Sequence, residues 1–229
     1  MNDLWIPLLL SLKVAGWATV LATVGGIAVA WGLSRWPSRW GDVVDSFLTL
    51  PMVLPPTVIG YYLLVWFGRR GWLGEWLRGY GIELVFTWQG AVIAAAVVAF
   101  PMVLKAARAA FLDVDRSLEQ AAAVLGASPA AVFWHISLPL AMRGILAGIL
   151  LAFARALGEF GATLMVAGNI PGRTQTLSIA IYQAVQAGDD DTATVLVLVT
   201  SVTCVLMLCL ASWLMPGRRQ RDRRSRRAS

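Results

Sequence analysis

Long stretches of mainly apolar, uncharged residues alternate with short polar stretches along this chain of 229 residues. A helix needs about 20 such residues to cross the ~30 Å hydrocarbon core of a bilayer. Because only helices and closed barrels satisfy their backbone groups there, unbroken runs of this length predict helices. The pattern predicts five spans, at residues 14–33, 46–68, 84–104, 145–165 and 192–215. We therefore expect an all-α transmembrane fold, a polytopic helical bundle in a single membrane domain of residues 1–217.

The more polar stretch 113–139 lies between the third and fourth predicted spans and is typical of two short helices. A first helix is expected from Glu119 to Leu125. Gly126 follows at the position of a C-terminal cap, where glycine tolerates the left-handed backbone that such caps adopt.

A second short helix is expected to begin at Ser128 and Pro129, the residue types favoured at an N-cap and at the first helical position. Pro139 is then expected to begin the next membrane segment. A helical elbow of this kind, held at one face of a membrane protein, indicates a docking element for a partner.

The composition indicates the class of protein, and the distribution of charged residues indicates its orientation in the membrane. With 58% hydrophobic and 14% charged residues, the chain is not an ordinary soluble domain. Its net charge of +6 does not indicate nucleic-acid binding, because seven arginines form a tail, 218–229, directly after an apolar span. We expect this tail to anchor the topology and to contact anionic membrane lipid.

Lysine and arginine are concentrated on one side of the predicted membrane. Thirteen of the nineteen lie in the loop after the first span, the elbow region and the tail, and four lie in the loops of the other side. The positive-inside rule therefore places the N-terminus outside and the elbow and the C-terminus in the cytoplasm of a multi-pass membrane protein.

Three prolines, Pro51, Pro55 and Pro56, stand near the start of the second predicted span. Proline removes an amide donor and bends or unwinds a membrane helix, which is tolerated where neighbours or a cavity satisfy the freed carbonyls. Two interpretations stay open. The prolines form a packing kink, or Pro55 and Pro56 belong to broken backbone that lines a translocation pathway.

Small residues recur every four positions in the fourth predicted span, which permits close approach of two helices in lipid. The approach could lie within the chain or at a subunit interface. The residues of this stripe are Gly144, Gly148, Ala152 and Ala156.

The same span contains two charged residues, Arg155 and Glu159, four positions apart and thus able to pair on one helix. A charge at mid-bilayer costs roughly 2.5–3.5 kcal/mol on insertion scales, so it normally faces protein or water. The pair is either a structural ion pair or part of the pathway or its gate.

After the fourth span, the stretch 168–185 contains Asn169, Arg173, Thr174 and Thr176. Guanidinium, amide and hydroxyl donors suit a tetrahedral oxyanion, which offers only acceptors. Arg173 is therefore a candidate pathway residue, although the same residues would also make an ordinary polar loop.

Motifs for nucleotide hydrolysis and metal binding are missing from the sequence. A P-loop needs a lysine preceded by glycine, whereas Lys13 and Lys105 each follow a leucine. No His, Cys and carboxylate cluster has metal-ligand spacing. His135 is the single histidine, and its place in the elbow favours a docking contact over catalysis. We expect no enzyme activity, no metal and no cofactor on this chain.

The elbow resembles the EAA motif of permease subunits from binding-protein-dependent ABC importers. That motif has a glutamate, two alanines, three residues, a glycine, nine residues and then isoleucine-x-leucine-proline. The usual glutamate position falls on Gln120, with Glu119 beside it. The resemblance implies that the residues which couple the permease to an ATPase are Glu119, Gln120, Ala121, Ala122, Gly126, Ile136, Leu138 and Pro139.

Two further segments are similar to the molybdate permease subunits of this family. One is residues 50–64 with the following Gly-Arg-Arg-Gly at 68–71, and the other is residues 153–176. Sulfate permeases share the Ala-Arg-Ala-Leu-Gly-Glu-Phe-Gly-Ala type of segment, so the fourth span alone does not select the substrate.

The resemblance implies a type I ABC importer permease in a bacterial inner membrane, built as a homodimer around a central pathway. Two cytoplasmic ATP-binding subunits, which would hold the ATP and Mg, are expected to clamp the elbows. A periplasmic oxyanion-binding protein would deliver molybdate, and also tungstate, to the outer face.

Other functions are weighed against this one. A sulfate or thiosulfate permease subunit would share the same architecture. A stand-alone secondary transporter or channel would explain neither the elbow nor the odd number of spans, and no inverted repeat is visible. A membrane-embedded enzyme would need convergent catalytic groups at one depth, which the sequence does not provide.

Overall fold

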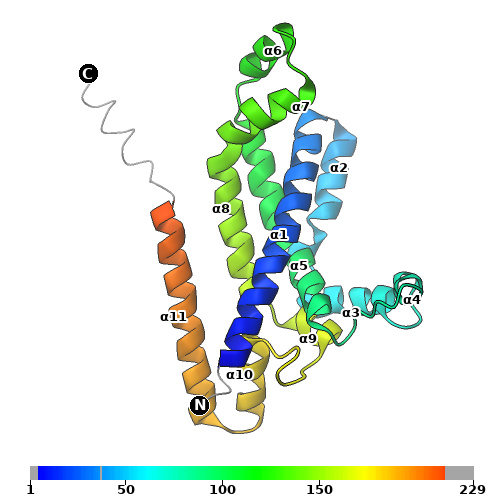
Figure 1. Cartoon of the computed structure of the whole chain (residues 1–229), viewed down its shortest axis with the longest axis vertical. Coiled ribbons are helices and arrows are strands. Elements are labelled where there is room, and N and C mark those ends of the chain that lie inside the picture. Colours follow the sequence, from blue (N-terminus) through cyan, green and yellow to red (C-terminus); the bar gives the residue numbers. More distant parts are fainter. Residues whose placement is uncertain (1–4, 37, 215–229) are drawn as a thin grey trace.

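The computed structural model describes residues 5–36 and 38–214, and all regular structure in that part is helical (Figure 1). The predicted tail, 218–229, lies outside the described residues. Four helices are long and apolar enough to cross a membrane: α1 (Trp5–Arg35), α5 (Trp88–Leu112), the continuous helix Pro129–Leu157, and α11 (Asp190–Leu214), of which residues 190–207 meet this criterion. Four of the five predicted spans are thus confirmed.

The second predicted span, 46–68, is not one helix, and this prediction was wrong. It contains the end of α2 (Arg39–Leu48), the short 3-10 helix η1 (Leu50–Met52) and α3 (Pro56–Phe67). The prolines at 51, 55 and 56 cause the division, because none of them can donate the amide hydrogen bond of a continuous helix. Of the two interpretations of the prolines, the structure therefore shows broken backbone rather than a kink, whereas a role in a pathway stays a prediction.

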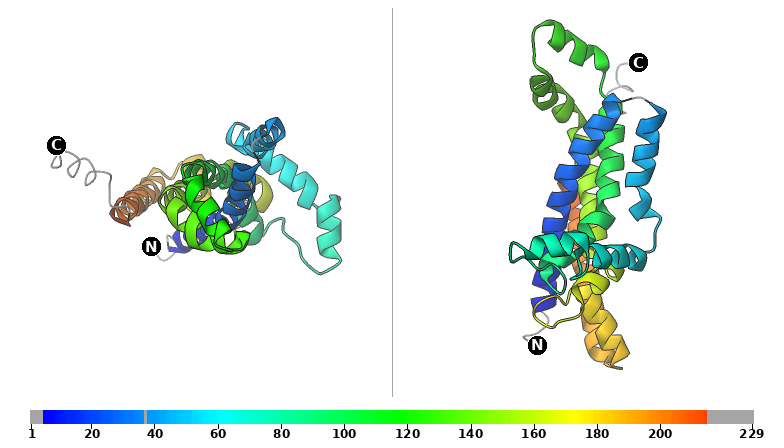
Figure 2. Two further views of the ribbon diagram at one scale, coloured as in Figure 1. Left: turned by 90° about the horizontal axis from the view of Figure 1, so that it is seen from above. Right: turned by 90° about the vertical axis from the view of Figure 1, so that its right-hand side faces the viewer.

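The helices of the divided span run in two different directions. From one end of the bundle, α2 returns beside α5, to which Asp45 is joined by ion pairs with Lys105 and Arg108. By contrast, α3 and α4 (Trp72–Arg78) project sideways from the long helices (Figures 1 and 2). The arm formed by α3 and α4 thus leaves the bundle between two passes of the chain.

The fourth predicted span, 145–165, is also divided. Helix α8 (Leu138–Leu157) ends at Gly158, and α9 (Gly161–Ala167) follows after a short break. After α9 the chain turns through α10 (Leu177–Gln186) into α11. A single helix through residue 165 was predicted because the apolar run continues, but apolarity alone does not reveal a helix end.

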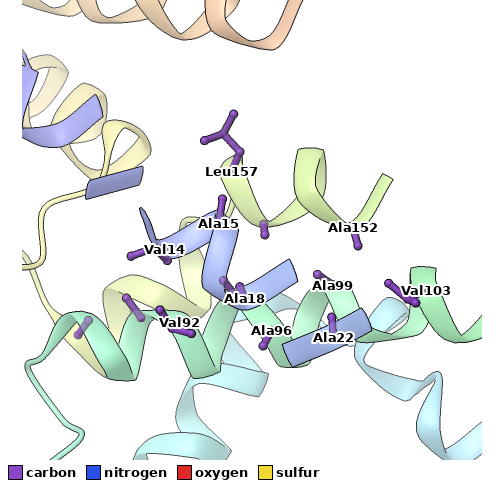
Figure 3. Packing of buried hydrophobic residues seen from close by; sticks show 14 residues of the cluster. Val14, Ala15, Ala18, Ala22, Val92, Ala96, Ala99, Val103, Ala152 and Leu157 are labelled. Carbon is purple, nitrogen blue, oxygen red and sulfur yellow. The ribbon is translucent and has the colours of Figure 1, made fainter. Parts of the chain in front are cut away.

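The core of the bundle lies where α1, α5 and α8 pack together, and small residues dominate it. Ala15, Ala18, Ala22 and Ala99 lie on the facing sides of α1 and α5, and all are 0–1% exposed (Figure 3). Without bulky side chains between them, the helix backbones can approach closely.

The predicted small-residue stripe of α8 is part of this core. A Cβ placed on Gly148 would lie 2.5 Å from the Cβ of Ala106, and one on Gly144 would lie 2.6 Å from that of Ala110. Farther along, Ala152 and Ala156 are buried in the cluster formed with α1 and α5. Of the two interpretations left open, the structure shows packing within the chain.

The molecule has two distinct ends (Figure 1). The elbow helices α6 (Arg116–Val124) and α7 (Pro129–Val132) lie at one end, and α11 runs from the opposite end toward it. The start of α1 and helix α10 lie at the other end. The chain therefore traverses the bundle an odd number of times between residues 5 and 214.

Candidate functional site

The first half of the elbow has the structure that its sequence predicts. The side chain of Asp115 accepts a hydrogen bond from the backbone N–H of Ser117 at 2.9 Å and so caps α6. This backbone hydrogen bond holds the pKa of Asp115 below its ordinary value, because it stabilises the charged carboxylate. At the other end Gly126 has φ +88°, and its N–H donates to the carbonyl of Ala123 at 3.0 Å. The predicted glycine cap is confirmed.

The second half of the elbow begins as predicted but does not end as predicted. Ser128 accepts a hydrogen bond from the N–H of Ala131 at 3.2 Å, as an N-cap does. The helix then continues without a break through a π-helical segment, η2 (Phe133–Ser137), into α8. Pro139 lies in the first turn of α8, as predicted, but the helix that leads into it is continuous with the second elbow helix, which was not predicted. Because the N–H of Leu138 bonds the carbonyl of Phe133, the register has shifted before the proline, which fits inside the first turn of α8.

Glu119 turns toward the bundle. Its Oε1 lies 2.9 Å from Nη2 of Arg35 at the end of α1, and it also accepts a hydrogen bond from the hydroxyl of Ser137. The neighbouring Gln120, at the usual glutamate position of the motif, is exposed. Gln120 is thus the more exposed of the two, although both residues line the groove beside α6.

The tip of the elbow carries exposed apolar side chains. Val124 and Leu125 are 88% and 87% exposed, and Leu118 and Trp134 are also exposed. The other residues with expected coupling roles surround them: Ala121 and Gly126 are exposed, whereas Ile136 and Leu138 are half-buried. Sequence reasoning did not single out Val124 and Leu125, although two apolar residues before a capping glycine in a polar elbow were a usable signal.

A second set of candidate residues meets at the two divided spans. A Cβ on Gly161 would lie 3.1 Å from the Cβ of Pro56, and one on Gly60 would lie 2.9 Å from the Cα of Ala162. The start of α3, after Pro55, therefore packs tightly against the start of α9. The structure brings together the two helix breaks that the sequence places about 100 residues apart.

Arg155 and Glu159 stand at this junction. Nη1 of Arg155 lies 2.7 Å from Oε2 of Glu159, whose side chain is only 1% exposed, so the predicted pairing is confirmed. The expectation that both lie on one helix was wrong, because α8 ends between them. The other oxygen of Glu159 accepts from the N–H of Ala162 at 2.8 Å and so satisfies the start of α9.

Arg173 lies apart from this pair, in the loop between α9 and α10. Its side chain is exposed and forms no ion pair or hydrogen bond within residues 5–36 and 38–214. Buried Thr174 holds the loop, since its hydroxyl accepts from the N–H of Ile170 at 3.0 Å. Nearby, the amides of Asn169 and Gln175 both donate to Oε1 of Gln183.

The described residues contain no group of three or more His, Cys, Asp or Glu side chains that could hold a metal ion. The ring of His135 is engaged locally, with Nδ1 3.0 Å from the carbonyl of Ala131. The candidate functional features among the described residues are an apolar-tipped elbow at one end and a junction of broken helices with a buried ion pair.

Known proteins share both the sequence and the fold. The molybdenum transport system permease protein ModB of Escherichia coli is 46% identical over 219 residues, covering 95% of this chain and 96% of that protein. The protein of the same name from Haemophilus influenzae is 44% identical, with 90% of each chain covered. A probable sulfate transport system permease protein, cysT, of Nephroselmis olivacea is 34% identical, with coverages of 89% and 72%.

Among solved structures, an inward-facing form of the MetNI methionine ABC transporter superposes with a TM-score of 0.72 at 16% identity, and 93% of each chain is covered. A family model described as binding-protein-dependent transport system inner membrane component matches residues 22–220. The chain therefore belongs to the family of binding-protein-dependent transport system inner membrane components, multi-pass proteins with the fold of type I ABC importer permeases.

Proposed function

We propose that this chain is the membrane subunit through which an ATP-driven importer moves molybdate, and also tungstate, into the cytoplasm. The 46% identity to a molybdenum permease along 95% of the chain carries this proposal, compared with 34% for the sulfate relative. The chain itself performs no chemistry in this scheme. ATP and Mg belong to a separate subunit.

In the proposed assembly two copies of the chain enclose the pathway and two cytoplasmic ATPases bind the elbows. Val124 and Leu125 support this arrangement, because large apolar side chains more than 80% exposed at the tip of a polar elbow favour burial against a partner. Gln120 and Ala121 would border that contact. A periplasmic oxyanion-binding protein would engage the opposite end of the bundle.

The proposed orientation places the elbow in the cytoplasm and the start of α1 outside. Basic residues support it, since Arg35, Lys105, Arg108 and Arg116 all lie in the part of the bundle that adjoins the elbow. Elbow motion driven by the ATPases would then reach the spans as rigid-body rotation, the usual form of domain movement.

The junction of broken helices is the proposed pathway or gate. Pro55, Pro56 and the Arg155–Glu159 pair lie where α3 meets α9, and helix ends rather than continuous helices face each other there. Arg173 lies in the loop beyond α9, and its side chain forms no ion pair or hydrogen bond with the part of the chain that the structure describes. It would offer a guanidinium to an incoming oxyanion from the outer side.

Uptake of labelled molybdate tests the function directly. Cells that express the chain with an ATPase and a binding protein are expected to accumulate molybdate only when the ATPase is active, and excess sulfate is expected to suppress uptake little. Strong suppression by sulfate would favour the second candidate, a sulfate or thiosulfate permease, which the 34% identical relative supports. Uptake that persists with an inactive ATPase would exclude both importers and favour a stand-alone transporter or channel.

A further inference from the structure

Five side chains at the base of the elbow, together with the backbone of the π-helical segment η2, form a closed ring that joins α1, α6 and η2. Arg35 pairs with Glu119 at 2.9 Å, and Glu119 accepts the hydrogen bond from Ser137, the last residue of η2. Phe133, the first residue of η2, packs edge-on against Trp31 with ring centroids 5.0 Å apart. The guanidinium of Arg35 closes the ring, 4.7 Å from the centre of the Trp31 ring.

The ring is partly shielded from solvent. Ser137 is 1% exposed and the Glu119 side chain 20%, whereas the Arg35 side chain is 40% exposed, so the carboxylate side of the ion pair is the drier one. The ring borders a groove of about 360 Å³ that Trp31, Arg35 and Glu119 help to line, together with Phe111 and Ala127. Outside the ring, α6 is held to α1 by one further polar contact, from Arg116 to the carbonyl of Ser34 at 3.3 Å.

The position of η2 makes this ring a link between the elbow and a membrane span. The π segment lies inside the continuous helix Pro129–Leu157, so a pull on Ser137 acts on the helix that becomes α8. Such segments occur frequently at functional sites, because the additional residue per turn loosens the regular hydrogen-bond ladder.

We propose that Glu119 is a positioning residue for coupling, which acts inside the permease rather than on the ATPase. Its carboxylate ties α6 to Arg35 of α1 and to Ser137 of η2, so that displacement of the elbow moves α1 and α8 together. The surface left for the ATPase is then Gln120 with the apolar tip of Val124 and Leu125. The role in coupling rests on the proposed function, whereas the ring itself does not.

The coupling role is tested on the reconstituted importer, with the permease, ATPase and binding protein in liposomes. Glu119→Gln keeps the side-chain size and an acceptor for Ser137 but removes the charge that Arg35 binds. Molybdate taken up per ATP hydrolysed is expected to fall about fivefold or more, the lower range of coupling between sites. The ATPase is expected to copurify as before, because the tip is unchanged. Asp113→Asn removes an exposed carboxylate nearby that has no ion pair within the described residues, and should leave the ratio unchanged.

Charge exchange sharpens the test. The double variant Arg35→Glu, Glu119→Arg restores an ion pair but loses the cation over Trp31, so it is expected to recover part of the uptake ratio that each single change loses. Loss of ATPase copurification in Glu119→Gln would show that Glu119 contacts the ATPase, and an unchanged ratio would show that the ring transmits nothing. Either result overturns the proposal.

Thermal unfolding of the purified permease separates this proposal from the proposed function. The shifts in Tm caused by Arg35→Ala and Glu119→Ala are expected to be non-additive, since the two side chains share one contact. Additive shifts in Tm would show that Arg35 and Glu119 do not interact, even if the importer is active. Non-additive shifts in a permease that imports no molybdate would support the contact between the two side chains and would contradict only the proposed transport function.

Discussion

Glu159 performs two structural tasks with its two oxygens. One oxygen lies 2.7 Å from Nη1 of Arg155 in an ion pair, and the other accepts a hydrogen bond from an amide at the start of α9, although the side chain is only 1% exposed. A buried carboxylate is tolerated only when its charge and its acceptors are matched in this way. Sequence spacing predicted the ion pair. It did not predict the capping contact, because that contact depends on a helix end that lies within an uninterrupted apolar run.

Removing one charge of this pair should lower the free energy of unfolding more than removing both charges. Arg155→Leu leaves Glu159 charged and buried, and we expect it to lower the free energy of unfolding by about 1–3 kcal/mol, less than for a fully buried pair because Arg155 is 29% exposed. Adding Glu159→Gln removes the second charge and retains an acceptor for Ala162. Thermal unfolding in detergent should show the double variant more stable than Arg155→Leu. The reverse order would contradict a charge-based account of the pair.

Gly126 is the residue at which the elbow turns. Its φ of +88° lies in the left-handed region, where a side chain costs about 1–2 kcal/mol, although the space around it is open. Gly126→Arg is expected to deform the elbow and to uncouple ATP hydrolysis from uptake while membrane insertion persists.

The matched control for this variant is Gly81→Arg, because Gly81 has φ +74° and equally open space in the loop after α4. It imposes the same kind of backbone strain far from the elbow, and should leave coupling unchanged. Equal loss of coupling in both variants would attribute the effect to general strain rather than to the elbow.

At the scale of helices, the contact between α5 and α8 depends on glycine. A Cβ on Gly148 would meet Ala106 at 2.5 Å, closer than packed carbon atoms allow. Gly148→Val should therefore destabilise the permease by about 1–3 kcal/mol, the usual cost of overpacking. Ala106→Gly in the same chain should restore part of the loss. Gly16→Ala is the control, since no atom lies within 4 Å of its added Cβ, and thermal unfolding is the measurement.

Element boundaries show where sequence reasoning succeeds and where it fails. Four spans were predictable because length and apolarity decide whether a helix crosses a bilayer. The break at Gly158 and the continuous helix through Pro139 could not be predicted, because each depends on hydrogen bonds that form only in the folded chain. Capping residues such as Gly126 and Ser128 were predictable because their bonds are local.

At the scale of the whole molecule, function is distributed between its two ends. The elbow end presents Val124 and Leu125, and the opposite end presents the loop with Arg173. The coupling motif was predictable from its spacing. The ring beneath it was not, because Trp31 and Arg35 lie about 80 to 100 residues from Glu119 and from η2 in sequence.

Changing the tip should separate assembly from folding. Val124→Ser with Leu125→Ser removes the exposed apolar side chains, and we expect the ATPase to be lost on copurification while the Tm of the permease stays within experimental error. Trp72→Ser, at an 81% exposed position on the α3–α4 arm, is the control and should retain the ATPase. Retention of the ATPase by the tip variant would place the docking surface elsewhere.

The alanine-lined contact between α1 and α5 has a further consequence for the conformational entropy that the bundle loses on folding. Alanine and glycine side chains have no rotamers to freeze, so bringing these helices together sacrifices almost no side-chain conformational entropy. For the same reason, this part of the interior has few alternative side-chain conformations into which it could repack when the helices are displaced. We therefore expect this contact to resist repacking under strain, so that the chain bends first at the helix breaks after Leu48 and Leu157.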